Sequence, residues 1–267
     1  MDPFIQVERT LHVDALYHAL DVIRPKDFYF PGESHDFWEL VYVRSGRVTA
    51  TADERVYHLS EGMLLFHKPM EFHRIWSEGD TCPHLMILSF RAGGSDMARL
   101  EKGCFVLDPA QRNRFEGITA MFRQARETPS PRTVTLTAVL LEGFLLRLTK
   151  AEELGHQEAS GKDAQYTKIV NVMKENCHKS MSLEELASQC GLSVSNMKRI
   201  FARFSDMGVA KYFLSLKMRR AMELLDEDVP ASQVAEILDF SEISYFYTVF
   251  KRETGLTPTQ YRRSGKG

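Results

Sequence analysis

The sequence predicts an α+β chain of two domains: an N-terminal β-barrel followed by two helices, and an all-helical C-terminal domain. The chain has 267 residues, which suits two domains of about 100–200 residues each. Short apolar runs separated by turn residues fill the first third, whereas later segments carry apolar residues at helical spacing. Finally, one helical pattern occurs twice towards the C-terminus.

The composition excludes several classes of protein. With 34 basic and 36 acidic residues, a net charge of −2 and 43% hydrophobic residues, the chain has neither a disordered nor a fibrous composition. Its 4 cysteines form no C-x-x-C pair, which argues against a disulfide scaffold and indicates a reducing compartment. No segment has the pattern of a signal peptide or a membrane-spanning helix. We therefore expect a cytoplasmic protein without a membrane partner.

The charge is unevenly distributed along the chain. Residues 161–267 carry 16 basic and 13 acidic side chains, a net +3, and residues 1–160 carry the other 18 and 23, a net −5. A basic half behind an acidic half hints at an anionic partner for the C-terminal part.

The first 92 residues are expected to form short strands, because aromatic and β-branched residues gather in runs between turn residues. Several short strands at near-regular spacing are typical of a barrel or a sandwich. The expected strands are residues 37–43, 47–51, 55–59, 63–66, 72–76 and 84–90.

Two helices follow, at residues 109–127 and 132–154, since apolar residues recur there every three or four positions. On the second helix Leu136, Leu140, Phe144 and Leu148 form one apolar stripe. Such a stripe suits either a dimer surface or a cover for the barrel.

The C-terminal part reads as a series of helices, at residues 165–176, 183–190, 194–204, 209–226, 232–238 and 242–253. Ser182 and Glu185 form a capping box, Gly191 ends that helix, and Ser193 caps the next one. A helix, a tight turn with glycine and a second helix form a helix-turn-helix unit. The polar segment before these helices reads as a linker. The expected domains are a barrel at 1–105, a helical dimerisation region at 106–155, the linker at 156–163 and a double helix-turn-helix domain at 164–267.

The helix-turn-helix unit is present twice. Leu186-Ala187 recurs as Val234-Ala235, and Leu192-Ser193 recurs as Phe240-Ser241, each 48 residues later. Phe201 and Tyr212 recur as Phe250 and Tyr261 at an offset of 49. Two tandem copies of one supersecondary unit rarely arise by accident.

The second copy carries a long signature: Phe240-Ser241, Ser244-Tyr245-Phe246, Phe250-Lys251, Gly255-x-Thr257-Pro258 and Tyr261-Arg262. With it, roughly the last hundred residues resemble the DNA-binding domain of AraC/XylS-type transcription regulators. Asp239 departs from the family, which usually has glycine there, and Asp206 and Val209 replace a G-x-x-P pattern in the first copy. Because aspartate adopts a left-handed turn at modest cost, we expect altered turn geometry within the same fold.

In a helix-turn-helix unit the second helix lies in the major groove, and its exposed side chains contact the DNA. We expect Met197, Ile200, Phe201 and Phe204 to be buried, and in the second copy Ser244, Phe246, Val249 and Phe250. Asn196 and Arg199 are the predicted base contacts, since these types pair bidentately with adenine and guanine. The predicted DNA-contacting residues are Val194, Ser195, Asn196, Lys198, Arg199 and Arg203 in the first copy, and Ser241, Glu242, Ile243, Tyr247, Thr248 and Lys251 in the second. Further phosphate contacts are expected from Lys217, Arg219, Arg220, Arg262 and Arg263.

In the N-terminal half, Glu33-x-His35-x-x-x-Glu39 with Gly46 further on resembles the first motif of cupin barrels. Gly62, Pro69 and His73 resemble the second motif more loosely. Since side chains alternate along a strand, His35, Phe37 and Glu39 share one side. The predicted effector-binding residues are Glu33, His35, Phe37, Glu39 and His73.

The same pocket allows two interpretations. Two histidines and a carboxylate are a ligand set of many non-haem metal sites, whereas a polar pocket with aromatic walls suits a polyhydroxylated small molecule. The cupin metal motif has histidine where this chain has Glu33. Sensor domains of the resembled kind normally lack metal, so we predict neither a metal nor a cofactor.

The sequence thus predicts a DNA-binding transcription regulator, an effector-responsive activator that acts as a homodimer and is not an enzyme. Its expected partners are double-stranded DNA and a carbohydrate-like small molecule, with RNA polymerase as a further candidate. The resemblance implies sugars or related metabolites as effectors. Two alternatives stay open: a cupin-type metal-binding protein or enzyme with a DNA-binding tail, and a DNA-binding protein that needs no effector.

Overall fold

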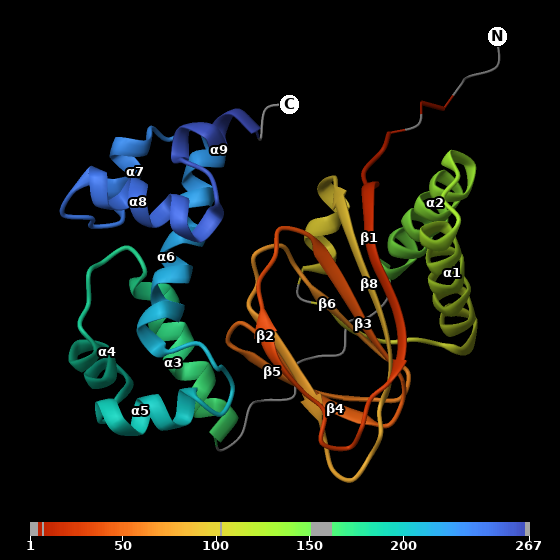
Figure 1. Cartoon of the computed structure of the whole chain (residues 1–267), viewed down its shortest axis with the longest axis horizontal. Coiled ribbons are helices and arrows are strands. Elements are labelled where there is room, and N and C mark those ends of the chain that lie inside the picture. Colours follow the sequence, from red (N-terminus) through yellow and green to blue (C-terminus); the bar gives the residue numbers. More distant parts are fainter. Residues whose placement is uncertain (1–4, 7, 102, 151–161, 265–267) are drawn as a thin grey trace. The chain divides into compact units, whose positions relative to one another are not determined.

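The computed structural model describes residues 5–6, 8–101, 103–150 and 162–264 (Figure 1). The chain divides into two compact units, residues 1–157 and 158–267, and each is described by itself. The expected linker at 156–163 lies outside the described residues except for its last two positions. No helix among the described segments is long and apolar enough to cross a membrane.

The first unit contains two antiparallel sheets. One has the strand order β1-β8-β3-β6-β9 and the other β2-β7-β4-β5. The side chains between them form one apolar core, and the outer face of the larger sheet forms a second core with two helices. The strands are β1 (His12–Ile23), β2 (Tyr29–Glu33), β3 (Trp38–Ser45), β4 (Arg47–Ala52), β5 (Arg55–Ser60), β6 (Met63–His67), β7 (His73–Ser77), β8 (His84–Gly93) and β9 (Cys104–Val106), with the 3-10 helix η1 (Ser95–Leu100) before β9.

The six strands expected from the sequence are present as β3 to β8, with ends that differ by one to three residues. Three further strands, β1, β2 and β9, are not among those that the sequence predicts. The long strand β1 has a mixed burial pattern, because one of its faces packs on helices while other positions are open to solvent. The sequence of β1 has no regular alternation of polar and apolar residues, so its extended conformation depends on pairing with β8.

The central strand β3 is buried on both faces, and its side chains alternate between two cores. Leu40 and Tyr42 belong to the core shared with the helices. Val41 and Val43 belong to the core between the sheets. The register in which β3 pairs with β6 and β8 therefore decides which core each of its side chains joins.

Helices α1 (Pro109–Glu127) and α2 (Pro131–Leu148) pack against each other and against β1, as Figure 1 shows. Asp108 and Ser130 cap their N-termini. Helix α2 ends at Leu148, so the expectation of helix at 149 and 150 is wrong, and the expected residues 151–154 lie outside the described segments.

The expectation of one continuous apolar stripe on α2 is also wrong. Phe144 and Leu148 are buried in the core against the larger sheet, whereas Leu136 and Leu140 are exposed. The four residues diverge in this way because the 3.6-residue turn rotates an i, i+4 series slowly around the helix. Only the N-terminal part of the stripe is available to a partner.

The second unit consists of helices. They are α3 (Lys162–Asn176), α4 (Leu183–Cys190), α5 (Val194–Phe201), α6 (Val209–Asp226), α7 (Ala231–Ile237), α8 (Ile243–Thr254) and α9 (Pro258–Ser264). Helices α3, α4 and α5 pack on one another, as do α7, α8 and α9 with the second half of α6, so α6 joins two similar groups (Figure 1).

Local signals set the ends of these helices. The predicted capping box of Ser182 and Glu185 opens α4, Gly191 ends it in the left-handed conformation, and Ser193 caps α5. The sequence predicts that this helix extends to residue 204, but α5 ends at Phe201. Phe204 lies in the turn that follows and is buried, as expected. Helix α6 spans the predicted residues.

The turn at Asp239 has the left-handed geometry expected where the family has glycine. Its φ angle is 54°. The Asp239 carboxylate accepts a hydrogen bond from the Ser180 backbone N–H at 2.8 Å, and the Ser180 hydroxyl donates to the Asp239 carbonyl oxygen at 2.8 Å. An aspartate here therefore ties the turn before α8 to the segment before α4, which a glycine side chain could not do.

Candidate functional site

Helix α5 presents the predicted DNA-contacting face of the first helix-turn-helix unit. Met197, Ile200 and Phe201 are buried, as expected. Four of the predicted contact residues are exposed and two are half-buried: Ser195, Lys198, Arg199 and Arg203 are exposed, and Val194 and Asn196 are half-buried. The helix therefore has one face packed and one face open to a partner.

The two predicted base contacts on α5 touch each other. The guanidinium Nη2 of Arg199 donates to the Asn196 Oδ1 at 2.8 Å. This bond leaves the Asn196 amide group free to act as a donor. The two side chains are thus held together on the surface of α5.

Helix α8 is the equivalent element of the second unit. Phe246, Val249 and Phe250 are buried as expected, but Ser244 is exposed, so its assignment to the packed face is wrong. Ser244 lies in the first turn on the solvent side, where its hydroxyl donates to the Glu242 carboxylate at 3.2 Å. Of the other predicted contacts, Tyr247 is half-buried and the remaining residues are exposed: Ser241, Glu242, Ile243, Thr248 and Lys251.

The basic residues expected to bind phosphate do not all reach the surface. Lys217 is only 6% exposed, and its ammonium group lies 5.0 Å from the centre of the Phe240 ring. Burial lowers the pKa of Lys217, although the charge of Asp239 acts in the opposite direction. Its assignment as a phosphate contact is therefore wrong in this arrangement. Arg220 pairs with Glu223, and Arg262 pairs with Asp228.

In the first unit, the backbone brings the predicted pocket residues together from both sheets. Gly32 has a φ of 100° at a register irregularity in β2, and a Cβ there would lie 2.7 Å from the Phe72 ring. This irregularity places Glu33 directly opposite His73 on β7. Glu39 lies on β3, in the other sheet, and His35 lies in the loop between β2 and β3.

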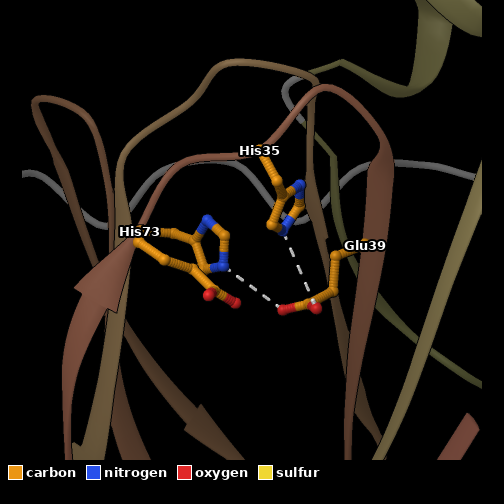
Figure 2. A group of neighbouring side chains, drawn as sticks. His35, Glu39 and His73 are labelled. Carbon is orange, nitrogen blue, oxygen red and sulfur yellow. Dashed lines mark ion pairs between the residues drawn. The ribbon is translucent and has the colours of Figure 1, made fainter. Parts of the chain in front are cut away.

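Four side chains converge in this cluster, and Figure 2 labels three of them: His35, Glu39 and His73. One ligand-type atom from each of Glu33, His35, Glu39 and His73 lies within 4.8 Å of the others. His73 Nε2 is 3.3 Å from one carboxylate oxygen of Glu39, and His35 Nε2 is 3.9 Å from the other. The Phe37 ring stacks on His35, with ring centres 3.7 Å apart. All five predicted effector-binding residues thus belong to one cluster.

The electrostatics of the pocket follow from burial and from the central carboxylate. Burial disfavours the charged form of Glu39, yet the neighbouring His73 outweighs it and lowers the pKa of that carboxyl. Burial likewise opposes a charge on His73, but Glu39 raises its pKa overall. For His35, burial and the nearby His73 prevail and lower the pKa.

Two residues behind the pocket were not identified from the sequence. His67 on β6 stacks on His73 with ring centres 4.3 Å apart, and its Nδ1 lies 3.2 Å from the Glu71 carboxylate. Burial lowers the pKa of His67 well below its usual value. No spacing in the chain marks His67, because it reaches the site through the pairing of β6 with β3 opposite Glu39.

Comparison with protein families assigns both units. The description "AraC-like ligand binding domain" matches residues 19–159, more than half of the chain. The chain belongs to the AraC family of transcription regulators. The description "Helix-turn-helix domain" matches residues 186–264, which contain α5 and α8. This AraC-family chain is therefore a DNA-binding transcription regulator with a ligand-binding domain, a finding that disfavours a metalloenzyme with a DNA-binding tail.

Curated relatives agree with this assignment along most of the chain. The transcriptional activator RhaR of Cronobacter sakazakii is 24% identical over 251 residues, 88% of this chain and 87% of that protein. The transcriptional activator RhaS of Escherichia fergusonii is 22% identical over 250 residues, 88% of each chain. Among solved structures, ToxT of Vibrio cholerae O395 aligns over 93% of this chain and 98% of its own at 12% identity, with a TM-score of 0.38 that supports no inference.

The cysteines of the first unit differ sharply in accessibility, so they should differ in reactivity. Cys82 is exposed, whereas Cys104 is 4% exposed and burial raises the pKa of its thiol to about 12. We expect iodoacetamide at pH 8 to alkylate Cys82 readily and to leave Cys104 unmodified until the protein is unfolded. Peptide mass spectrometry measures both sites in one sample. Equal labelling of the two thiols in the folded protein would contradict the burial of Cys104.

Proposed function

We propose that this regulator activates transcription by reading two successive major grooves with α5 and α8, under control of a small molecule bound in the barrel. The observation that carries the DNA-reading part is the open polar face of α5 behind the capped turn at Ser193. Helix α6 has 18 residues, a length of about 27 Å. That length suits two reading helices placed in grooves about 34 Å apart. Activation is supported by the relatives RhaR and RhaS, which are named activators.

The two reading helices are proposed to contribute unequally. On α5, Asn196 and Arg199 would contact bases, while Ser195, Lys198 and Arg203 would lie nearer to phosphates. Val194, at the start of the helix, adds an apolar contact. On α8 the exposed Ile243 can contact a thymine methyl group and Glu242 can accept from cytosine, with Ser241, Tyr247, Thr248 and Lys251 around them. On α8 the exposed Arg252 pairs with Glu253, whereas Lys198 and Arg199 on α5 are followed by the exposed Arg203. We therefore expect the first unit to supply more of the affinity.

Arg199→Ala tests the proposed reading residue. An operator is first selected from a random duplex pool with the wild-type chain, and affinities are then measured by fluorescence anisotropy at fixed salt. Loss of a bidentate base contact costs roughly 1–3 kcal/mol, so we expect specific binding to weaken about 5- to 150-fold and sequence preference to relax. Arg132→Ala, at an exposed arginine of α2, is the matched control. Unchanged affinity and specificity in Arg199→Ala would rule out this residue as a base contact.

The effector is proposed to be an oxygen-rich small molecule such as a sugar or a sugar acid. Carboxylates and imidazoles of the cluster can bond hydroxyl groups, while the Phe37 ring, stacked on His35, offers an apolar face. Sugars and sugar acids both present the oxygen atoms that these groups can bind.

A thermal-shift screen of the full chain against neutral sugars and sugar acids tests the effector class. A ligand that binds only the folded state stabilises it by about 2.7 kcal/mol at one hundred times its Kd, so one class should raise the melting temperature by several degrees. The shift should disappear in Glu39→Gln and persist in Glu78→Gln, a surface control. If no compound shifts melting, and operator affinity is the same with and without every compound, the effector-independent alternative holds.

The regulator is proposed to act as a homodimer through α1 and α2. Leu136, Val139 and Leu140 are exposed on α2. Val139 and Leu140 border a groove of about 570 Å³ between the two helices. A paired reading domain would also raise the local concentration of the second copy at the operator. That gain matters because residues 161–267 carry a net charge of only +3, and phosphate contacts supply much of DNA affinity.

Leu140→Asp tests the dimer surface. A carboxylate buried in an apolar interface is strongly unfavourable, so we expect the variant to sediment as a monomer at micromolar concentration while the wild type sediments as a dimer. Asn113→Asp, at an exposed position of α1, should leave the dimer intact. A wild-type monomer, or a Leu140→Asp dimer of wild-type stability, would place any self-association elsewhere.

Three further points complete the proposal. The chain acts in the cytoplasm, contacts RNA polymerase when it is bound beside a promoter, and performs no catalysis. The first and last points are supported by its membership in a family of transcription regulators.

A further inference from the structure

The two histidines of the barrel pocket are oriented alike. His35 Nδ1 lies 2.9 Å from the Phe37 carbonyl oxygen, and His73 Nδ1 lies 3.2 Å from the Glu71 carbonyl oxygen. A carbonyl oxygen only accepts, so each Nδ1 carries a hydrogen and donates it. This bond fixes each imidazole ring and directs its Nε2 into the pocket. Metal-binding histidines are held by the same kind of second hydrogen bond.

Both Nε2 atoms are buried and lack a hydrogen-bonding partner of normal geometry. The His73 side chain is only 3% exposed. Both atoms face the carboxylate of Glu39, which itself accepts from the Ser89 hydroxyl at 3.1 Å. A proton on His73 Nε2 would allow it to donate a hydrogen bond to Glu39, but His35 Nε2 would still lack a partner. A cation between the rings and the carboxylates satisfies all of these atoms at once.

The spacing suits coordination to one ion. Two nitrogen or oxygen ligands at about 2.1 Å from a tetrahedral ion lie about 3.4 Å from each other. The separation between His73 Nε2 and Glu39 Oε1 is 3.3 Å, and that between His35 Nε2 and Glu39 Oε2 is 3.9 Å. Glu33, exposed at the edge of β2, brings the fourth ligand atom within 4.8 Å of the others.

We propose that Glu33, His35, Glu39 and His73 bind one divalent first-row transition-metal ion in the ligand-binding domain of this regulator. Two imidazole nitrogens favour a transition ion over Mg²⁺ or Ca²⁺, and two carboxylates balance its charge. This inference reverses the expectation of no metal that followed from Glu33 replacing the histidine of the cupin motif. Structure places the Glu33 carboxylate where it can serve as a ligand in place of imidazole.

The proposal also concerns effector recognition, and in that respect rests on the proposed function. Glu33 is the exposed member of the cluster, so positions of the ion left without a protein ligand would be open to the effector. An effector with a hydroxyl or carboxylate oxygen would then be bound directly by the ion. Metal binding itself depends on neither the effector nor the DNA.

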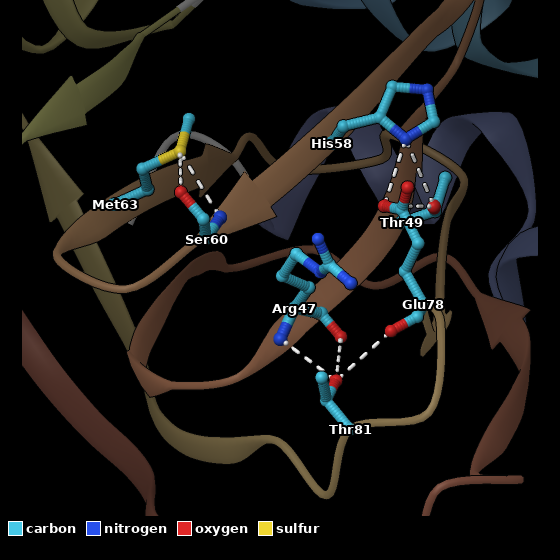
Figure 3. Close-up of polar contacts among 7 residues, drawn as sticks. All are labelled: Arg47, Thr49, His58, Ser60, Met63, Glu78 and Thr81. Carbon is cyan, nitrogen blue, oxygen red and sulfur yellow. Dashed lines mark hydrogen bonds and ion pairs between the residues drawn. The ribbon is translucent and has the colours of Figure 1, made fainter.

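Cobalt(II) chloride is the probe for this site. The untagged full chain is stripped with EDTA, then titrated with Co²⁺ while the visible d–d absorption is followed, and bound metal is counted by mass spectrometry after dialysis. We expect one equivalent to bind. Affinity should fall more than tenfold in His35→Asn, His73→Asn and Glu33→Gln. His58→Asn is the control, because His58 also lies beside a carboxylate, 3.0 Å from Glu78, but outside the cluster (Figure 3).

The outcomes separate this site from adventitious binding. One equivalent in the wild type and in His58→Asn, with weakened binding in the three cluster variants, supports the site. No stoichiometric binding, or equal binding in all variants, overturns it. If the histidine variants do not fold, as judged by circular dichroism, the exposed Glu33→Gln decides: unchanged affinity there overturns the four-ligand set. Operator binding, measured on the metal-free samples, reports on the proposed function alone.

Discussion

The alternation of side chains along β3 is the constraint on which the first unit depends. Leu40 and Tyr42 face the helices, whereas Val41 and Val43 face the interior between the sheets. Glu39 follows the interior series and so reaches the polar pocket. Because both faces of β3 are buried, a shift of one residue would turn this carboxylate towards α1 and α2 and would exchange the side chains of the two cores. The register that holds the barrel together thus also positions the centre of the pocket.

The pocket needs both sheets as well as this register. Glu33 and His73 face each other across β2 and β7, while Glu39 lies on the opposite sheet beside His67. Such a cluster of polar groups inside an apolar core is costly unless each group has a partner. The hydrogen bonds of His35 and His73 to backbone carbonyls reduce this cost and fix the directions in which the rings point. A cluster whose side chains are fixed in this way can bind a ligand with little rearrangement.

In the second unit, short-range signals set the ends of the helices, and a long-range contact joins the two helix-turn-helix copies. Caps at Ser182 and Ser193 and the left-handed Gly191 set the first helix-turn-helix. The bond between Asp239 and Ser180 then joins the second copy to the first. In the same region the ammonium group of Lys217 lies 5.0 Å from the centre of the Phe240 ring. These contacts link the turn before α8 to the segment before α4 and to α6.

The sequence by itself determined the two-unit organisation, the helix-turn-helix repeat and most helix ends, because caps, turns and apolar periodicity act within a few residues. It also identified five members of the cluster, since the cupin-like spacing places Glu33, His35, Phe37 and Glu39 close in the chain. Tertiary structure alone decided what depends on distant pairing: the strand β1, the place of His67 behind His73, and the burial of Lys217. It likewise divided the stripe on α2 between core and surface, because helix rotation relative to the sheet, and not the spacing of leucines, decides which side chains meet water.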